Sequence, residues 1–203
     1  GSDVVLADRN GEPFAVLNLR EKYLINKKEY ERKLYGTNDS AHPGVRMVKA
    51  MGPVFLGGDI SVFRRRPGPY KHYELSPRQA RRLFEDRGWR KVVGFHTRNV
   101  PHRGHEFIQS EAFRQTFADG LFIHPVVGGK KTGDFQAGPI VKSYELLIQQ
   151  FYPQGKVVFG TCATFSRYAG PREALFTAIV RQNFGCSHFI VGRDHTGVGD
   201  FYH

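Results

Sequence analysis

The sequence is poor in the features that mark secreted and membrane proteins. Its 203 residues include only two cysteines, Cys162 and Cys186, and no run of 18 or more apolar residues. Two cysteines without metal-like spacing provide no disulfide framework and suit a reduced cytoplasm. The lack of a long apolar run argues against a membrane span, and the first residues do not resemble a signal peptide. We therefore expect a cytoplasmic protein with no membrane partner.

Acidic residues are also scarce. Nineteen Asp and Glu stand against thirty Lys and Arg, which gives a formal net charge of +11. A basic protein attracts anions such as nucleic acids or phosphorylated small molecules. Aromatic residues do not alternate with the basic clusters as they do on RNA-binding surfaces, so we expect no nucleic-acid partner. A site that handles several phosphate charges would account for part of the excess.

The first third of the chain, residues 3–70, contains short apolar stretches separated by glycine and proline. This pattern predicts an all-β region. Asp8-Arg9-Asn10-Gly11 lies between two such stretches and predicts a β-hairpin, because Asn-Gly provides the positive φ angles that a type I′ turn needs. The segment 66–69, which contains two prolines and a glycine, is expected to be a linker.

Residues 71–203 alternate between short apolar runs and helical segments. We expect strands at 92–95, 121–127, 157–160 and 188–192, and helices at 76–87, 102–117, 140–151 and 171–183. This alternation, with near-continuous apolar strands, predicts an α/β fold with a doubly wound parallel sheet. Ligands bind such sheets at the carboxyl ends of the strands. The residues that follow each strand are therefore the candidates for function.

The first candidate segment, 96–105, follows the first of these strands. His102 and His105 are three residues apart and share one face of the first helical turn, where free N–H groups and the helix dipole favour phosphate. Gly104 would let a base or sugar approach the backbone closely, and the guanidinium of Arg98 matches a tetrahedral oxyanion. The alternatives are two surface histidines or a metal pair, although a metal would need a third ligand that this stretch does not obviously supply.

The second candidate segment, 192–199, follows the strand at 188–192. Its glycines suggest a backbone that lies close to a ligand, and Arg193 and His195 add positive charge. An ordinary strand-to-helix turn, with Asp194 as the cap of the next helix, accounts for the same pattern equally well.

Together the two segments resemble the ATP sulfurylase family. The family carries Gln-x-Arg-Asn, then His-x-x-His, and later Gly-Arg-Asp-His-Ala-Gly; here Arg98-Asn99, 102–105 and 192–195 occur in the matching order and spacing. Further matches lie at 131–134 and 167–174, and the resemblance covers nearly the whole chain. It implies part of a β-rich PUA-like domain at 3–70 and a nucleotidyltransferase domain at 71–203. It also implies that the family's proteins begin earlier and continue past residue 203.

The resemblance implies a sulfate adenylyltransferase, in which a sulfate oxygen attacks the α-phosphorus of Mg·ATP and pyrophosphate leaves without a covalent enzyme intermediate. The implied catalytic residues are Thr97, Arg98, Asn99, His102 and His105. The implied ATP-binding residues are His96, Arg98, Asn99, His102, His105, Gly192, Arg193, Asp194 and His195. The implied sulfate-binding residues are His96, Arg98 and Thr196. Mg²⁺ is expected to arrive with ATP, with no dedicated metal site on the protein.

Two positions depart from the family pattern, and both contact sulfate in the family. His96 replaces a glutamine and Thr196 replaces an alanine, although Thr196 still offers its backbone N–H. His96 either donates a hydrogen bond as a neutral ring or adds a positive charge, and the nearby Arg98 would lower its pKa. The alternative functions are a same-fold enzyme for another oxyanion and a non-catalytic nucleotide-binding module, which the retained basic residues argue against. Expected partners are ATP, sulfate or a related oxyanion, further copies of the chain, and a fused or separate adenylyl-sulfate kinase.

Overall fold

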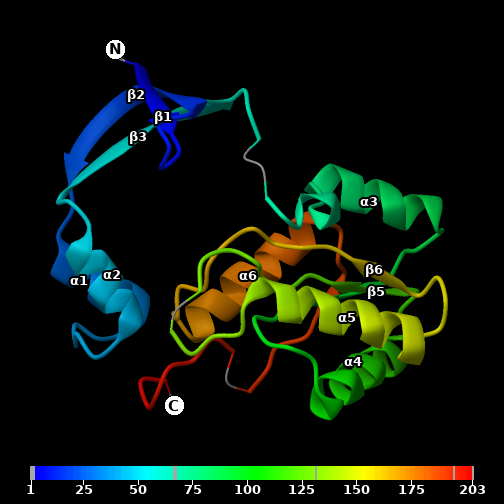
Figure 1. The fold of residues 1–203 in the computed structure, drawn as a ribbon. Coiled ribbons are helices and arrows are strands. Elements are labelled where there is room, and N and C mark those ends of the chain that lie inside the picture. Colours follow the sequence, from blue (N-terminus) through cyan, green and yellow to red (C-terminus); the bar gives the residue numbers. More distant parts are fainter. Residues whose placement is uncertain (1–2, 66–67, 131, 194, 203) are drawn as a thin grey trace. The chain divides into compact units, whose positions relative to one another are not determined.

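The computed structural model describes residues 3–65, 68–130, 132–193 and 195–202. The chain, shown in Figure 1, divides into two compact units. The first comprises the chain up to Pro69 together with Val198–Phe201, and the second comprises Tyr70–Gly197 together with Tyr202. None of the helices in the described residues combines the length and the apolar character that crossing a bilayer requires.

The first unit is not the all-β region that its sequence predicts. Its sheet is antiparallel in the order β1-β2-β3, and two helices lie between β2 and β3 in the sequence. The elements are β1 (Asp3–Ala7), β2 (Pro13–Leu24), α1 (Lys27–Tyr35), α2 (Pro43–Ala50) and β3 (Val54–Val62).

Both helices of this unit begin at side-chain caps, which a pattern of apolar stretches does not reveal. Asn26 accepts a hydrogen bond from the Glu29 N–H at the start of α1. At the start of α2, His42 Nδ1 accepts from the N–H groups of Gly44 and Val45, at 3.1 and 3.4 Å. Caps satisfy backbone donors that a helix end otherwise leaves unpaired. Local polar chemistry therefore decides the structure of this segment.

The predicted hairpin between β1 and β2 is present, but the turn type is wrong. The strands are joined by residues 8–12, and within this loop only Gly11 has a positive φ angle, of 82°. A type I′ turn needs two such residues. The loop is instead ordered by Asp8, whose Oδ1 accepts hydrogen bonds from the N–H groups of Asn10 and Glu12 at 2.9 and 3.1 Å.

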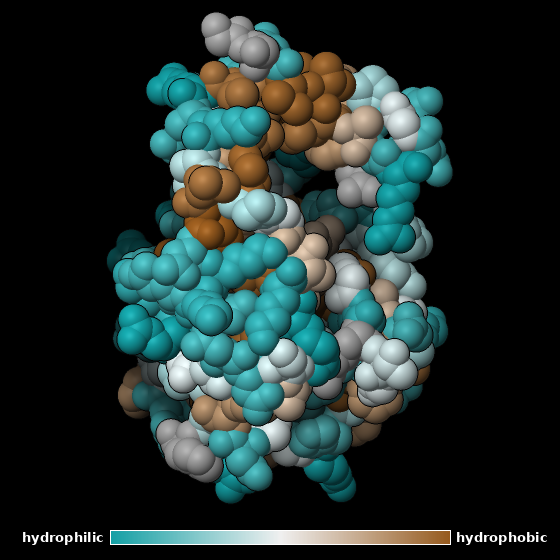
Figure 2. Space-filling model, turned by 90° about the vertical axis from the view of Figure 1, so that its left-hand side faces the viewer, coloured by the Kyte–Doolittle hydropathy of each residue, from teal (hydrophilic) through white to brown (hydrophobic). Residues whose placement is uncertain are grey.

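Apolar side chains remain exposed on the sheet of the first unit. Figure 2 shows hydrophobic atoms gathered over this sheet. Val5, Leu24, Ile60 and Val62, which come from all three strands, are 61, 76, 59 and 62% exposed. The described residues of the unit therefore leave part of its sheet uncovered.

The second unit has the α/β architecture that the sequence predicts. Its four strands are parallel and lie in the order β6-β5-β4-β7. The elements are the 3₁₀ helix η1 (Lys71–Tyr73), α3 (Pro77–Asp86), β4 (Val92–Phe95), α4 (Arg103–Thr116), β5 (Gly120–Ile123), α5 (Ala137–Phe151), β6 (Val157–Phe159), α6 (Pro171–Asn183) and β7 (His188–Phe189).

Three strands of this sheet end earlier than predicted, and β6 does so by a single residue, at Phe159. β5 ends four residues before the predicted 127, because Pro125 has no N–H for the ladder, and pairing returns only at the isolated bridge between Val126 and Cys162. β7 is an edge strand of two residues, followed by a single hydrogen bond from the Ile190 N–H to the Gly94 carbonyl at 3.0 Å.

Helices cover both faces of the parallel sheet (Figure 1). On one face α4 and α5 pack against Val93 and Phe95 of β4 and Leu121 and Ile123 of β5. On the other face α3 packs against side chains that alternate with these, which are Val92, Phe122 and Val158. The alternation follows from the two-residue period of a strand. It confirms the doubly wound arrangement.

The strand order places a switch point between β4 and β7. The connection from β4 runs through α4 to β5 on one side, whereas α6 leads to β7 on the other side of β4. In doubly wound sheets the ligand crevice opens where the connections diverge in this way. The segments after β4 and after β7 are the two that the sequence selects.

We expect Gly128, in the segment after β5, to tolerate no side chain. A Cβ at this position would overlap the backbone carbonyl of Thr164, whereas a Cβ at the adjacent Gly129 would meet no atom within 4 Å. Gly128→Ala should lower the free energy of unfolding by about 2–3 kcal/mol, because backbone must move to relieve the overlap. Gly129→Ala is the matched control and should leave urea denaturation unchanged. Equal midpoints for the two variants would contradict this packing.

Candidate functional site

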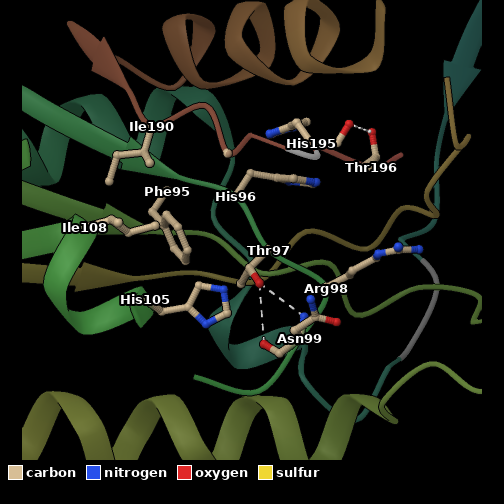
Figure 3. A pocket seen from close by; sticks show the side chains of 11 residues that line it. Phe95, His96, Thr97, Arg98, Asn99, His105, Ile108, Ile190, His195 and Thr196 are labelled. Carbon is tan, nitrogen blue, oxygen red and sulfur yellow. Dashed lines mark hydrogen bonds between the residues drawn. The ribbon is translucent and has the colours of Figure 1, made fainter. Parts of the chain in front are cut away.

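Residues from the two strand ends line one cavity of about 220 Å³ (Figure 3). Those after β4 come from the first candidate segment and those after β7 from the second, which confirms that the two segments share a pocket. The lining residues are Phe95, His96, Thr97, Arg98, Asn99, His105, Ile108, Ile190, Gly192, His195 and Thr196. Of the remaining predicted residues, His102 lies beside His105, Arg193 is exposed and not part of the lining, and Asp194 lies outside the described residues.

Arg98 is held in place by two residues to which sequence analysis gave no role. Its Nη1 lies 3.7 Å from Asp134 Oδ1, and its guanidinium lies 5.1 Å from the ring centre of Tyr168. The Tyr168 hydroxyl donates to Asp134 Oδ2 at 3.2 Å, which closes the group. Asp134 and Tyr168 fall in the motifs at 131–134 and 167–174, so those matches were the signal that could have revealed them. Apart from this long ion pair with Asp134, the buried Arg98 Nη1 has no hydrogen-bond partner among the described residues.

Thr97 and Asn99 order the loop that carries Arg98. The Asn99 N–H donates to Thr97 Oγ1 at 3.1 Å, drawn as a dashed line in Figure 3. This is the local turn that threonine hydroxyls favour. Thr97 is buried and Arg98 keeps 22% of its side chain exposed. The turn therefore fixes the backbone on both sides of the guanidinium.

His102 caps helix α4 with its own side chain. Its Nδ1 accepts a hydrogen bond from the Gly104 N–H at 3.1 Å, so the ring proton of the neutral tautomer lies on Nε2. A Cβ at Gly104 would lie 2.9 Å from the His102 ring, so the absence of a side chain there makes room for the cap. Gly104 thus has a packing role beside the predicted one, and the expectation that it lets a base or sugar approach the backbone stays a prediction.

The first turn of α4 offers fewer free N–H groups than the sequence suggests. The N–H groups of His105 and Glu106 donate to the His102 carbonyl at 2.8 and 3.2 Å, and that of Gly104 is taken by the cap. The donors left at this helix end are mainly imidazoles. The rings of His102 and His105 lie 3.9 Å apart between centres. Burial lowers the pKa of His105, and the neighbouring His102 lowers it further.

His96 lies at the base of the pocket, 8% exposed, with its ring stacked on that of His195 at 5.5 Å between centres. Both His96 ring nitrogens are buried, and neither has a hydrogen-bond partner in the described part of the chain. Burial holds the pKa of His96 well below its usual 6.5, and the positive charge of Arg181 adds to this effect. The expectation from the sequence that Arg98 lowers the pKa of His96 is wrong, because the effect comes from burial and from Arg181. A ring in this setting is a neutral donor, the role of an amide.

We expect the oxyanion affinity of the pocket to show no step caused by His96 at neutral pH. The folded-state pKa is depressed, so the ring gains a proton only well below about pH 6.5. The Kd of sulfate, used as a probe oxyanion and measured from about pH 6 to 8, should show the same pH dependence in the parent and in His96→Gln. Weakening of sulfate affinity with rising pH that disappears in His96→Gln would show instead that the ring binds as a cation.

The segment after β7 is held by helix α6 and by an unusual backbone conformation. His195 Nε2 lies 2.9 Å from Thr177 Oγ1 of α6. Thr196 is buried and has a φ angle of 54°, and its hydroxyl donates to the His195 carbonyl at 2.7 Å. A β-branched residue in the left-handed region is strained, and such strain persists mainly where the surroundings impose it. The loop is therefore held in one conformation at the pocket wall.

Neither metal ligands nor acidic residues dominate the site. Across the described residues, no group of three or more His, Cys, Asp and Glu side chains is arranged to hold a metal ion. Asp134 carries a carboxylate close to the pocket arginine, and it pairs with Arg98. Arginine and imidazole donors suit an anion.

Comparison with known proteins identifies both parts of the chain. Residues 71–203 match the family model described as ATP-sulfurylase, and residues 1–65 match that of a PUA-like domain. The sulfate adenylyltransferase of Thermococcus onnurineus is 47% identical over 98% of this chain and 52% of its own. Those of Staphylothermus marinus and Synechocystis sp. are 48 and 46% identical over the whole of this chain and 52% of theirs. The chain spans about half the length of the curated relatives it matches.

A solved structure has the same fold. The hexameric APS kinase from Thiobacillus denitrificans matches with a TM-score of 0.73 and 25% identity, over 96% of this chain and 34% of that one. The family match extends over more than half of the sequence and contains every residue that lines the pocket. The chain therefore belongs to the ATP-sulfurylase family.

Proposed function

We propose that the protein carrying this chain is a sulfate adenylyltransferase, which joins AMP from ATP to sulfate and releases pyrophosphate. The observation that carries the proposal is a set of nitrogen donors at a cavity formed by two strand ends. They are the Arg98 guanidinium and the ring nitrogens of His96, which have no hydrogen-bond partner among the described residues. Buried donors without partners are costly, so an oxyanion that accepts from them would stabilise the site. The names of the relatives support sulfate as that oxyanion.

In the proposed reaction a sulfate oxygen forms a bond to the α-phosphorus of ATP while the bond from that phosphorus to the β-bridging oxygen breaks. Pyrophosphate carries away the electron pair, and no covalent enzyme intermediate forms. Arg98, His96 and the Thr196 N–H would hold the sulfate, and His102 and His105 would stabilise charge on the leaving oxygen. Catalysis would then come from positioning and charge stabilisation.

The rest of the nucleotide is assigned to the second segment and to its surroundings. Gly192 and His195 line the cavity, and we propose that they, with Arg193 and Asp194, contact the nucleotide. The cavity of about 220 Å³ is smaller than the ~300–1,000 Å³ typical of ligand pockets. It would therefore take the reacting oxyanion and α-phosphate, while the adenosine would extend beyond it.

Magnesium is proposed to enter as part of Mg·ATP. Mg²⁺ prefers carboxylate, phosphate and water oxygens, whereas the pocket presents guanidinium and imidazole nitrogens. The described residues that line the pocket do not fit a magnesium site on the protein. The phosphates of ATP would supply the metal ligands.

Pyrophosphate release from ATP, measured in the full-length protein with a panel of oxyanions, tests the proposal. Release that requires sulfate, at a higher kcat/KM than with any other oxyanion, is the expected result. Preference for another oxyanion would identify a same-fold enzyme with a different substrate and overturn the sulfate assignment. Binding of ATP without release for any oxyanion would leave a non-catalytic nucleotide-binding module.

We also propose a cytoplasmic homo-oligomer whose product is used by an adenylyl-sulfate kinase. ATP is abundant in the cytoplasm, and the structural neighbour is titled as a hexameric APS kinase. Light scattering at micromolar concentration would test the oligomer. A fused or co-purifying ATP-dependent activity that consumes the product would test the link to a kinase.

A further inference from the structure

Helix α6 buries polar residues and exposes apolar ones. Glu173, Thr177 and Arg181 are spaced four residues apart on one face and are only 3, 3 and 1% exposed. Leu175 and Ile179, on another face, are 64 and 47% exposed. A helix that packs on a sheet normally shows the opposite pattern. The buried polar stripe of α6 therefore needs an explanation.

The first two residues of the stripe hold loops of the site. Glu173 accepts hydrogen bonds from the N–H groups of Arg167 and Ala169, at 2.9 and 3.1 Å. Thr177 contacts His195, as described above. Both side chains thus have partners among the loops beside the pocket. Arg181, the third residue of the stripe, is the one that carries a positive charge.

Arg181 is a buried cation with no acidic partner in the described part of the chain. Its Nη2 donates to the His124 carbonyl at 2.9 Å, and its Nε is buried with no hydrogen-bond partner among the residues that the structure describes. Within the same residues it forms no ion pair with a carboxylate. Guanidinium groups keep their proton in proteins, and an uncompensated buried charge is strongly unfavourable. This cost indicates that the buried charge has a role in the folded protein.

The position of Arg181 relates it to the pocket. A Cβ at Gly94 in β4 would lie 3.1 Å from Arg181 Cβ and Cγ. The stem of the arginine therefore crosses β4 two residues before His96, which forms the base of the cavity. The absence of a side chain at Gly94 makes this approach possible.

Among the described residues, the ionisable groups around Arg181 provide no counter-charge. His96, His124 and His195 lie after β4, β5 and β7, and in each case burial lowers the pKa and Arg181 lowers it further; that of His124 falls to about 3. Burial raises the pKa of both neighbouring thiols, Cys162 and Cys186, so they are neutral as well. Glu173, the acidic residue that favours the charged form of His195, lies two helical turns from Arg181.

We propose that Arg181 is a positioning residue of the anion site, whose buried charge is balanced by the bound oxyanion. The guanidinium acts through His96 and the ends of β4 and β5 without touching the ligand. In this arrangement His96 and His195 stay neutral donors, and the site attracts an anion without a titratable cation at its base. The inference rests on the proposed function for the identity of the ligand as an oxyanion.

Two neutral variants and one charged variant test the proposal. In Arg181→Met the Kd of inorganic sulfate, measured by calorimetry, should rise by about 10-fold, because loss of a fixed charge lowers the local anion concentration. In the free variant the pKa of the His96 and His195 rings, followed by NMR, should rise. Arg181→Lys keeps the charge and should restore most of both properties. Arg181→Gln, which retains a donor for the His124 carbonyl, replaces the methionine variant if that variant does not fold.

Arg81→Met is the matched control. Arg81 is exposed and donates to the carbonyls of Gln182 and Asn183 at the end of the same helix, at 3.0 and 2.9 Å. Its removal should leave sulfate affinity and both histidine titrations unchanged. A folded neutral variant at position 181 with parental sulfate affinity and parental titrations would overturn the inference. The NMR readout needs no catalysis, so failure of the proposed function and failure of this inference can be told apart.

Discussion

Arg98→Ala is expected to lower kcat by about 10³-fold, the upper part of the range for loss of one preorganised oxyanion donor. The guanidinium is fixed between Asp134 and Tyr168, and its buried Nη1 has no hydrogen-bond partner among the described residues. An alanine would remove both the donor and its positive charge. Steady-state pyrophosphate release at saturating ATP and sulfate measures the change.

Arg98→Lys separates charge from geometry. Lysine keeps the charge but lacks the planar fork of donors, so its kcat should lie between those of the parent and the alanine variant. Arg82→Ala, which removes an exposed arginine paired with Asp86 on α3, should retain full turnover. An alanine variant at position 98 with more than about a tenth of the parental kcat would be inconsistent with a transition-state donor of this kind.

The single variants His105→Ala and His102→Ala should each lower kcat by about 10²-fold, with a smaller change in the Michaelis constants. The two rings lie side by side at the start of α4, and His105 lines the pocket. Donors that act on charge developing during the reaction affect turnover more than binding. Single-turnover measurements would separate this effect from product release.

His102 needs a second variant because it has two roles. His102→Ala should also lower the free energy of unfolding by about 1 kcal/mol, since the ring caps α4. Asn is a good helix cap, so His102→Asn should recover stability while turnover stays low. If His102→Asn recovered both stability and turnover, the His102 ring would serve only as a cap. Full turnover in both alanine variants would place the phosphates elsewhere.

The architecture of the second unit is readable from the sequence because local and tertiary preferences agree there. β4 and α6 have the predicted bounds: the strand is a continuous apolar run, and α6 begins at Pro171, where proline is favoured. The two helices of the first unit were missed because their starts depend on caps at Asn26 and His42, whose effect appears only with backbone geometry.

In the candidate site, too, some features could be predicted from the sequence and others depend on side-chain geometry. The two motifs after strands predicted which loops meet, because the ends of parallel strands lie at one edge of a sheet. The capping role of His102 and the partners of Arg98 depend on side-chain geometry that the spacing of residues does not contain. Arg181 was missed for a different reason: an arginine in a helix is ordinarily a surface residue, and only its burial reveals it.

Exchange of labelled pyrophosphate into ATP by the full-length protein tests the central claim most directly. If the sulfate and the α-phosphate meet in the pocket between β4 and β7 and react without a covalent intermediate, exchange should occur only when sulfate is present. Arg98→Ala should then slow it by about 10³-fold. Exchange without sulfate would show an adenylated enzyme. Absence of exchange with sulfate present, in a protein that binds ATP, would contradict the proposed reaction altogether.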